Sequence, residues 1–277
     1  MRRRRLIRQF IVVSLLLIVV VVLLFPFLWM VSTSLKPPEE VFTPTPRWIP
    51  LNPTLQNFAH ILGETSFPRY FLNSVVVAFV TMLLALVVTV FAGYALSRYR
   101  FRGKQAFSLW LLVSQMFPPM LLVIPIFVLM LKLGLYNTYA SLIITYGTFA
   151  LPFSTWMLKA YFDTVPLDLE EAAMVDGCTR LQALARVVLP LAAPGIVTVA
   201  LFMFILAWQE YMFALTLTRT TDMRTLPVGI SLFLGEYRVL WGSLMAGSVV
   251  VTAPVILLFS YLQRYIVEGL TLGAVKG

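Results

Sequence analysis

Long uncharged stretches alternate with short charged segments along the whole chain. Six stretches hold more than twenty residues each: Gln9 to Leu35, Tyr70 to Ser97, Gln105 to Leu131, Leu133 to Leu158, Val187 to Gln209 and Val239 to Gln263. An ionised side chain at the centre of a bilayer costs at least about 2.5 kcal/mol, and a helix needs about 20 residues to cross. The pattern therefore predicts six transmembrane helices, at about residues 10–32, 71–96, 106–131, 138–160, 191–213 and 240–263.

Composition supports a membrane protein. Hydrophobic residues make up 60% of the chain and charged residues only 12%, with a mean hydropathy of +0.90, whereas soluble domains carry about 25% charge. The first apolar stretch, Phe10 to Val31, is too long for the core of a typical signal peptide, so we expect a retained helix. The fold class expected is all-α and polytopic.

Positive charge predicts the orientation of the six spans. With the N-terminus inside, 14 of the 21 Lys and Arg residues fall in inner segments, above all in Arg2 to Arg8, Arg98 to Lys104 and the segment after the fourth span. This bias follows the positive-inside rule, so both termini are expected in the cytoplasm. The net charge of +9 is then a topology signal, and no nucleic-acid partner is needed to explain it.

Several kinds of site are excluded by what the chain lacks. Its one cysteine, Cys178, excludes an internal disulfide, and with a single histidine, His60, neither a Cys/His metal site nor a Cys–His catalytic pair is expected. We predict no catalytic residues, no metal and no cofactor on this chain. A phosphate-binding loop is also absent, because Gly103-Lys104 is preceded by Arg98 in the place of its first glycine and followed by Gln105 in the place of Ser or Thr.

Two spans have unusual interiors. Three prolines in the third span, Pro118, Pro119 and Pro125, predict a bend, because each removes a backbone hydrogen bond; the bend could be purely structural or could border a gated pathway. The fourth span carries several hydroxyls, which could hold helices together or face a polar solute.

The charged segment at 164–190 interrupts the apolar pattern. Pro166 suits the first turn of a helix, and the acids that follow it favour a helix N-terminus. Gly177 is a natural left-handed stop, while Thr179 and Gln182 form a capping-box pattern that opens a second helix. The segment is predicted to be a helix, a glycine turn and a second helix at the cytoplasmic surface.

The first of these helices combines small, apolar and acidic residues. Ala172 and Ala173 would let another backbone approach closely, and a carboxylate beside them, from Glu170, Glu171 or Asp176, offers a charge-assisted hydrogen bond to an arginine. The alternative is an amphipathic connector on lipid, but an anionic inner surface disfavours so many acids. Docking to a cytosolic protein is the preferred interpretation.

The residues of this segment carry a family resemblance. Glu171-Ala172-Ala173, Asp176-Gly177 and Leu189-Pro190 resemble the EAA loop of permease subunits of bacterial ABC importers. The stretches FLNSVVVA (71–78), LPFSTWMLKAYFDTVPLDLEEAAMVDG (151–177), WQEYMFALTLT (208–218) and EGLTLGAVKG (268–277) resemble the maltose-type subfamily, which imports sugars. The resemblance covers essentially the whole chain.

The resemblance implies a role and partners. The chain would be a single permease domain over 1–277 in the bacterial cytoplasmic (inner) membrane, alternating between two accesses for a maltose-, trehalose- or oligosaccharide-like sugar. Its partners would be a second permease subunit, two ATP-binding subunits that hold ATP and Mg, an extracytoplasmic sugar-binding protein and the lipid bilayer. The segment at 164–190 would be the coupling helix, with Glu171 pairing with an ATPase arginine. Its expected contact residues are Glu170, Glu171, Ala172, Ala173, Asp176, Gly177, Leu189 and Pro190.

Two further sets of residues are expected to function. Sugars require polar groups and aromatic surfaces in a concave site, and the candidates are Tyr146, Trp156, Trp208, Gln209, Glu210 and Tyr211. Glu210 is the only acid that abuts a membrane run, although it could lie at the outer interface. The C-terminal tail, with Gly273 and Lys276, either contacts the ATPase or frays.

Two other classes of function compete with the importer subunit. A self-sufficient secondary transporter or channel for a polar solute would need intramembrane carboxylates or a charge ring, and only Glu210 offers itself. A membrane enzyme would need an acid–base or metal constellation, which the sequence lacks.

Overall fold

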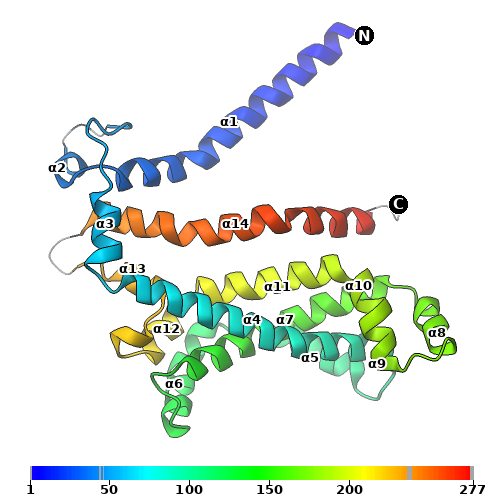
Figure 1. The fold of residues 1–277 in the computed structure, drawn as a ribbon. Helices are drawn as coiled ribbons and strands as arrows, with labels where there is room; N and C mark the ends of the chain where they lie inside the picture. The colour runs from blue at the N-terminus through cyan, green and yellow to red at the C-terminus, as the bar shows by residue number, and fades with distance from the viewer. Residues whose placement is uncertain (1, 44, 46, 236–238, 275–277) are drawn as a thin grey trace. The chain divides into compact units, whose positions relative to one another are not determined.

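The structure, a computed structural model, describes residues 2–43, 45, 47–235 and 239–274 (Figure 1). Over these ranges the chain is helical, with turns and one isolated β-bridge between Leu234 and Val239. The chain divides into two compact units, residues 1–68 with 229–253 and residues 69–228 with 254–277. The expected all-α fold class is confirmed for the described residues.

The first unit contains the N-terminal helix and the segment that follows it. Its elements are α1 (Arg2–Ser34), α2 (Pro38–Val41), α3 (Gln56–Gly63) and the first part of α14 (Trp241–Ala274). The buried Asn57 amide donates to the carbonyls of Ser34 and Lys36, both at 2.9 Å, which fixes α3 to the end of α1. Burial lowers the pKa of the Lys36 ammonium, and the Glu40 carboxylate opposes that shift.

The second unit holds the remaining helices and the later part of α14. In chain order they are α4 (Phe67–Arg98), α5 (Lys104–Ser114), η1 (Pro119–Leu122), α6 (Val123–Lys132), α7 (Tyr139–Thr164), α8 (Leu167–Val175), α9 (Arg180–Ala183), the π-helical turn η2 (Leu184–Val188), α10 (Leu189–Leu191), α11 (Ala193–Trp208), α12 (Met212–Leu217), η3 (Thr221–Met223) and α13 (Leu226–Ser231). α4 begins, and α13 ends, just inside the first unit.

Four of the six expected spans are single long helices. They are Gln9–Ser34, Phe67–Arg98, Tyr139–Thr164 and Trp241–Gln263, and their length and composition suit a bilayer. The expected spans at 106–131 and 191–213 are not single long helices. Lys104–Ser114 and Pro119–Lys132 are bent from each other by 90°, and Ala193–Trp208 is bent by 81° from Arg180–Leu191, the helical segment before it; counting each pair as one span gives six.

Prolines explain the sharper break. Pro118 and Pro119 lack N–H donors, and Pro118 has extended backbone angles, φ −61° and ψ 121°, as expected for a residue that precedes proline. The helix cannot continue through this pair. The bend predicted in the third span is therefore confirmed, and it is a break rather than a gentle kink.

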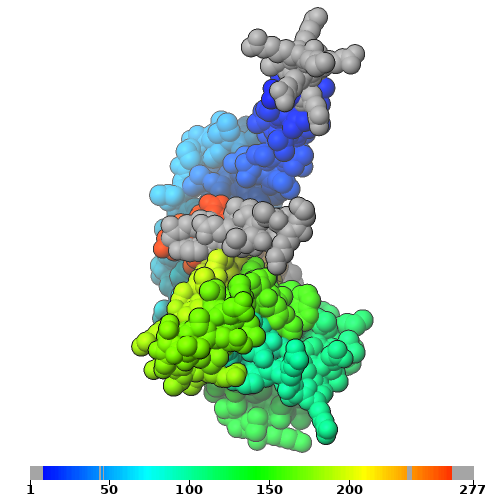
Figure 2. All heavy atoms as spheres, turned by 90° about the vertical axis from the view of Figure 1, so that its right-hand side faces the viewer, coloured from blue at the N-terminus to red at the C-terminus, as the bar shows by residue number. Residues whose placement is uncertain are grey.

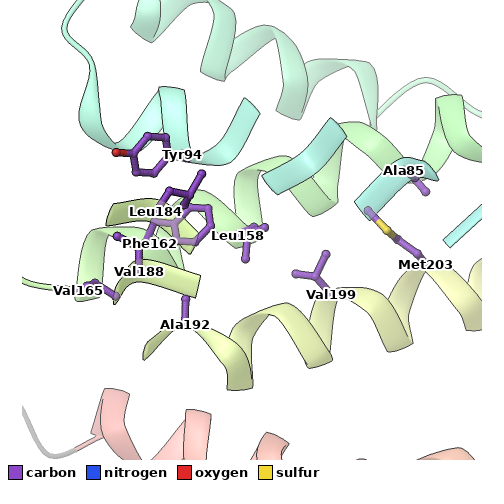
Figure 3. Packing of buried hydrophobic residues seen from close by; sticks show 11 residues of the cluster. Ala85, Tyr94, Leu158, Phe162, Val165, Leu184, Val188, Ala192, Val199 and Met203 are labelled. Atoms are coloured by element: carbon purple, nitrogen blue, oxygen red, sulfur yellow. The ribbon is translucent and has the colours of Figure 1, made fainter. Parts of the chain in front are cut away.

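The apolar core of the second unit joins α4, α7 and α11 to the segment that follows α7. Leu158 and Phe162 of α7 lie with Val199 and Met203 of α11 (Figure 3). A Cβ atom at Gly195 would lie 2.2 Å from Cγ of Tyr161, so α11 approaches α7 more closely than any larger residue allows. This packing holds both ends of the charged segment between α7 and α11 against the apolar core.

A charged helix–glycine–helix segment as the candidate site

The local structure around Gly177 follows the sequence signals. α8 begins directly after Pro166 and gives way to a turn in which Gly177 has φ +92°. The Cys178 N–H donates to the carbonyl of Ala173 at 3.0 Å, and the Gly177 N–H to that of Met174 at 3.1 Å, the pattern of a glycine-terminated helix. The predicted turn is confirmed.

The second helix opens with the expected capping box. The Thr179 N–H donates to Oε1 of Gln182 at 2.8 Å, and the Gln182 N–H to Oγ1 of Thr179 at 3.3 Å. The helix then widens into a π-turn, in which the Leu189 N–H donates to the carbonyl of Leu184. Because Pro190 lacks an N–H, this widening occurs where a regular ladder would lose a donor. Leu189 is half-buried and Pro190 exposed.

Glu170 points into the protein. Its Oε2 accepts from Nε of Arg98 at 2.9 Å and its Oε1 from the Tyr94 hydroxyl. The side chains of Glu170 and Arg98 are only 1% and 7% exposed. Nη2 of Arg98 also donates to the carbonyl of Val165 at 2.9 Å. The end of α4 is thus tied to α8 and to the corner between α7 and α8.

Figure 3 shows how Tyr94 contributes to this arrangement. Its ring lies beside Phe162 and Leu184 in the apolar core, while its hydroxyl points away from them. Tyr94 lies at the boundary between the core and the ion pair, because its ring is buried among apolar side chains while its hydroxyl donates to Glu170.

The opposite face of α8 is open. Glu171, Ala172 and Asp176 are exposed and Ala173 is half-buried. Two larger apolar side chains share the open face, Leu169 at 45% and Val175 at 88% exposure. In Figure 2 this segment is the yellow-green surface turned toward the viewer, with the blue-green start of α5 beside it. Exposed apolar side chains beside a carboxylate suit a protein contact better than water.

The residues expected in the substrate pathway are only partly brought together. Gln209, Glu210 and Tyr211 form the break between α11 and α12. Both oxygens of Glu210 accept backbone N–H groups at the start of α12, from Phe213 at 2.8 Å and from Ala214 at 3.0 Å. Glu210 therefore caps a helix.

The remaining pathway candidates come from α7 and the end of α11, and the tail candidates from the C-terminal end of the chain. Tyr146 is buried in α7 within electrostatic reach of Glu210. Trp208 stacks on Phe204, and the half-exposed Trp156 stacks on Phe153. Gly273 belongs to α14, whereas Lys276 lies outside the described residues.

Three residues that organise the second unit were not predicted from the sequence. Tyr94 carried no signal inside its apolar run, and Arg98 was interpreted only as a topology charge. The third is Asn73, fully buried, whose amide donates to the carbonyls of Asp222 and Arg224 at 2.8 and 2.7 Å. An amide within an apolar run is itself a signal, because it must find partners there.

Among the described residues, no group of three or more His, Cys, Asp or Glu side chains is arranged to hold a metal ion.

Comparison with known proteins shows the family. Residues 85–271 match the family described as binding-protein-dependent transport system inner membrane component. The chain belongs to this family. It is therefore a permease subunit of an ABC importer, in a family of transport proteins of the inner membrane rather than of enzymes.

Individual relatives match the permease over most of its length. It is 41% identical to the trehalose/maltose transport system permease protein MalG of Thermococcus litoralis over 92% of each chain. It is also 41% identical to the trehalose transport system permease protein SugB of Mycobacterium tuberculosis, over 92% of this chain and 93% of the relative. A solved structure of a bacterial ABC transporter involved in the import of the acidic polysaccharide alginate matches with a TM-score of 0.82 at 25% identity, covering 94% of this chain and 96% of that one.

Proposed function

We propose that this permease imports a sugar, as one half of a membrane pore whose other half is a second permease subunit. The names of its relatives support a carbohydrate, since they describe transport of trehalose, maltose, diacetylchitobiose and sulfoquinovosyl glycerol. The proposal includes a sugar-binding protein on the outer side and two ATP-binding subunits, carrying ATP and Mg, on the inner side. The chain itself lacks a phosphate-binding loop.

We further propose that α8 is the coupling helix and that both termini are cytoplasmic, with residues 1–277 acting as one permease domain. The observation that carries this proposal is the two-sided character of α8. One face is held by the buried Glu170, while the other presents Leu169, Val175 and Glu171 without a covering element. A helix that is anchored on one side and open on the other suits a docking element.

The free energy needed to switch the permease between its two accesses requires contacts over the whole open face of α8. Moving a permease from 1:99 to 99:1 between its two accesses takes about 5.5 kcal/mol of differential binding, and one surface ion pair supplies at most about 1 kcal/mol. Glu171 alone is therefore insufficient. Burial of Leu169 and Val175, at about 25 cal/mol for each Å² of apolar surface, is expected to supply the larger part.

The proposal is tested by charge reversal on the open face. In the complex reconstituted with its ATP-binding subunits, Glu171→Lys should reduce co-purification of those subunits and lower sugar-stimulated ATP hydrolysis and transport. Glu64→Lys, the same change at an exposed acid of the first unit, is the matched control and should do neither. If Glu171→Lys leaves assembly and transport intact, α8 is a surface connector.

A second measurement separates the importer from a self-sufficient transporter. The chain alone in liposomes should move no sugar, with or without ion gradients, until the second permease subunit, the ATP-binding subunits, the sugar-binding protein and ATP are added. Uptake by the chain alone would overturn the ATP-driven function.

A further inference from the structure

We propose that Arg98 and Glu170 are positioning residues that make α4 the element transmitting movement of α8 to the outer loop at 218–226. This inference rests on the proposed coupling function of α8. It adds a specific route through the subunit, and it separates the roles of two adjacent acids: Glu171 faces the partner, while Glu170 holds the permease's own α4.

Every charged-group oxygen and nitrogen of the ion pair between Arg98 and Glu170 has a hydrogen-bond partner. Both oxygens of Glu170 are occupied, by Arg98 and Tyr94. Three nitrogens of Arg98 are also occupied, by Glu170, the Val165 carbonyl and, at 3.3 Å, the Ser97 hydroxyl. Because both side chains are buried, separating α8 from α4 would leave a charge without solvent or partner, which is strongly unfavourable. The two helices are therefore expected to move together.

Beside this ion pair, α4 packs closely against α7. A Cβ at Gly93 would lie 3.2 Å from the backbone nitrogen of Lys159, so α4 and α7 are in close backbone contact one turn before Arg98. The Tyr94 ring packs edge-on against Phe162 at 6.2 Å between ring centroids. The end of α4, the end of α7 and α8 thus form one packed body with little room for sliding.

The other end of α4 binds the segment that follows α12. There Asn73 binds the carbonyls of Asp222 and Arg224 and accepts from the Tyr139 hydroxyl at 2.7 Å. Next to it, Oγ of Ser74 accepts from the Leu226 N–H at 2.8 Å. Both side chains are buried. The backbone of the segment after α12 is therefore attached to α4 through the buried side chains of Asn73 and Ser74.

Together these contacts fix both ends of one uninterrupted helix. From Asn73 to Arg98, α4 is about 38 Å long at 1.5 Å per residue, and it contains no proline or break between them. In the proposed orientation, one end meets the ATPase-facing segment and the other the loop on the side of the sugar-binding protein. The test of this route is a measurement of the coupling between ATP hydrolysis and sugar transport.

The decisive readout is sugar transported per ATP hydrolysed in the reconstituted complex, with and without the sugar-binding protein. Glu170→Gln keeps the open face of α8, so the ATP-binding subunits should still co-purify, but the sugar-to-ATP ratio should fall at least tenfold. Arg98→Lys retains the charge without the forked donors and should give an intermediate ratio. A merely structural role would reduce the yield of folded complex and leave the ratio of the assembled fraction unchanged.

Further variants make the outcome unambiguous. Asn73→Ala should also lower the ratio, and the double variant Glu170→Gln/Asn73→Ala should be no worse than the more affected single variant, because both interrupt the same route. A normal ratio in assembled Glu170→Gln, or additive losses in the double variant, would overturn the proposal. Loss of ATPase binding in Glu170→Gln would also overturn it, by placing Glu170 in the docking face. Failure of the coupling function itself is separately visible, since Glu171→Lys would then transport normally.

Discussion

Two neighbouring acids, Glu170 and Glu171, have opposite environments. Successive residues of a helix point about 100° apart, so one carboxylate reaches Arg98 and Tyr94 while the next remains exposed. The sequence predicted that this helix carries functional acids but could not say which acid faces inward. Which acid faces inward depends on Tyr94 and Arg98, which lie more than seventy residues earlier in the chain and so outside any local sequence pattern.

Glu210 provides a prediction at the same scale. Because its carboxylate accepts two N–H groups of α12, Glu210→Ala should cost about 0.5–2 kcal/mol of stability, measured as a lower thermal midpoint of the purified complex. Glu210→Gln retains one acceptor oxygen and should lose less.

The comparison also tests the alternative function of Glu210. If the carboxylate binds the transported sugar, Glu210→Gln would abolish transport while the thermal midpoint stayed close to that of the unmodified complex. If Glu210 instead only caps α12, stability and transport should fall together, and both should fall further in Glu210→Ala than in Glu210→Gln.

At the scale of the element, the predictable features were those with local causes. The turn at Gly177 and the capping box of Thr179 and Gln182 formed as predicted, since each depends on residues within one turn of the chain. The full break at Pro118 exceeded the predicted bend, whereas Pro152 and Pro254 lie inside continuous helices. A single proline removes one hydrogen bond, which neighbouring helices can compensate; two in succession also exclude helical backbone at the first.

The contact between α7 and α11 gives a prediction about packing. Gly195→Ala would place a methyl group on the Tyr161 ring, and such overpacking typically costs about 1–3 kcal/mol. The thermal midpoint of the purified chain should fall. Gly147→Ala, at a helical glycine with no atom within 4 Å of the added Cβ, is the matched control and should leave it unchanged or slightly raised. Equal midpoints for the two variants would contradict the packing described.

At the scale of the whole molecule, the all-α fold class and the number of apolar stretches could be predicted from the sequence. The division into two compact units was not apparent, because apolar runs carry no information about which helices meet. The buried polar contacts of Asn73 were missed for the same reason: their partners come from a loop almost 150 residues later.

The proposed orientation can be tested with the chain's single cysteine. Cys178 is partly exposed beside the turn at Gly177, so a membrane-impermeant maleimide should label it in inside-out vesicles and not in right-side-out ones. In a Cys178→Ser background, Glu64→Cys should show the reverse pattern. Labelling of Cys178 from outside would place α8 on the wrong side for a cytosolic partner and reverse the topology.

The buried pair of Arg98 and Glu170 also has an evolutionary consequence. Losing either partner alone leaves an isolated buried charge, whereas replacing both by apolar residues of similar volume is often neutral. Substitutions at these two positions should therefore arise together in diverging lineages. Glu171, which no residue of this chain restrains in the described ranges, should instead change in step with the docking groove of the ATP-binding subunit.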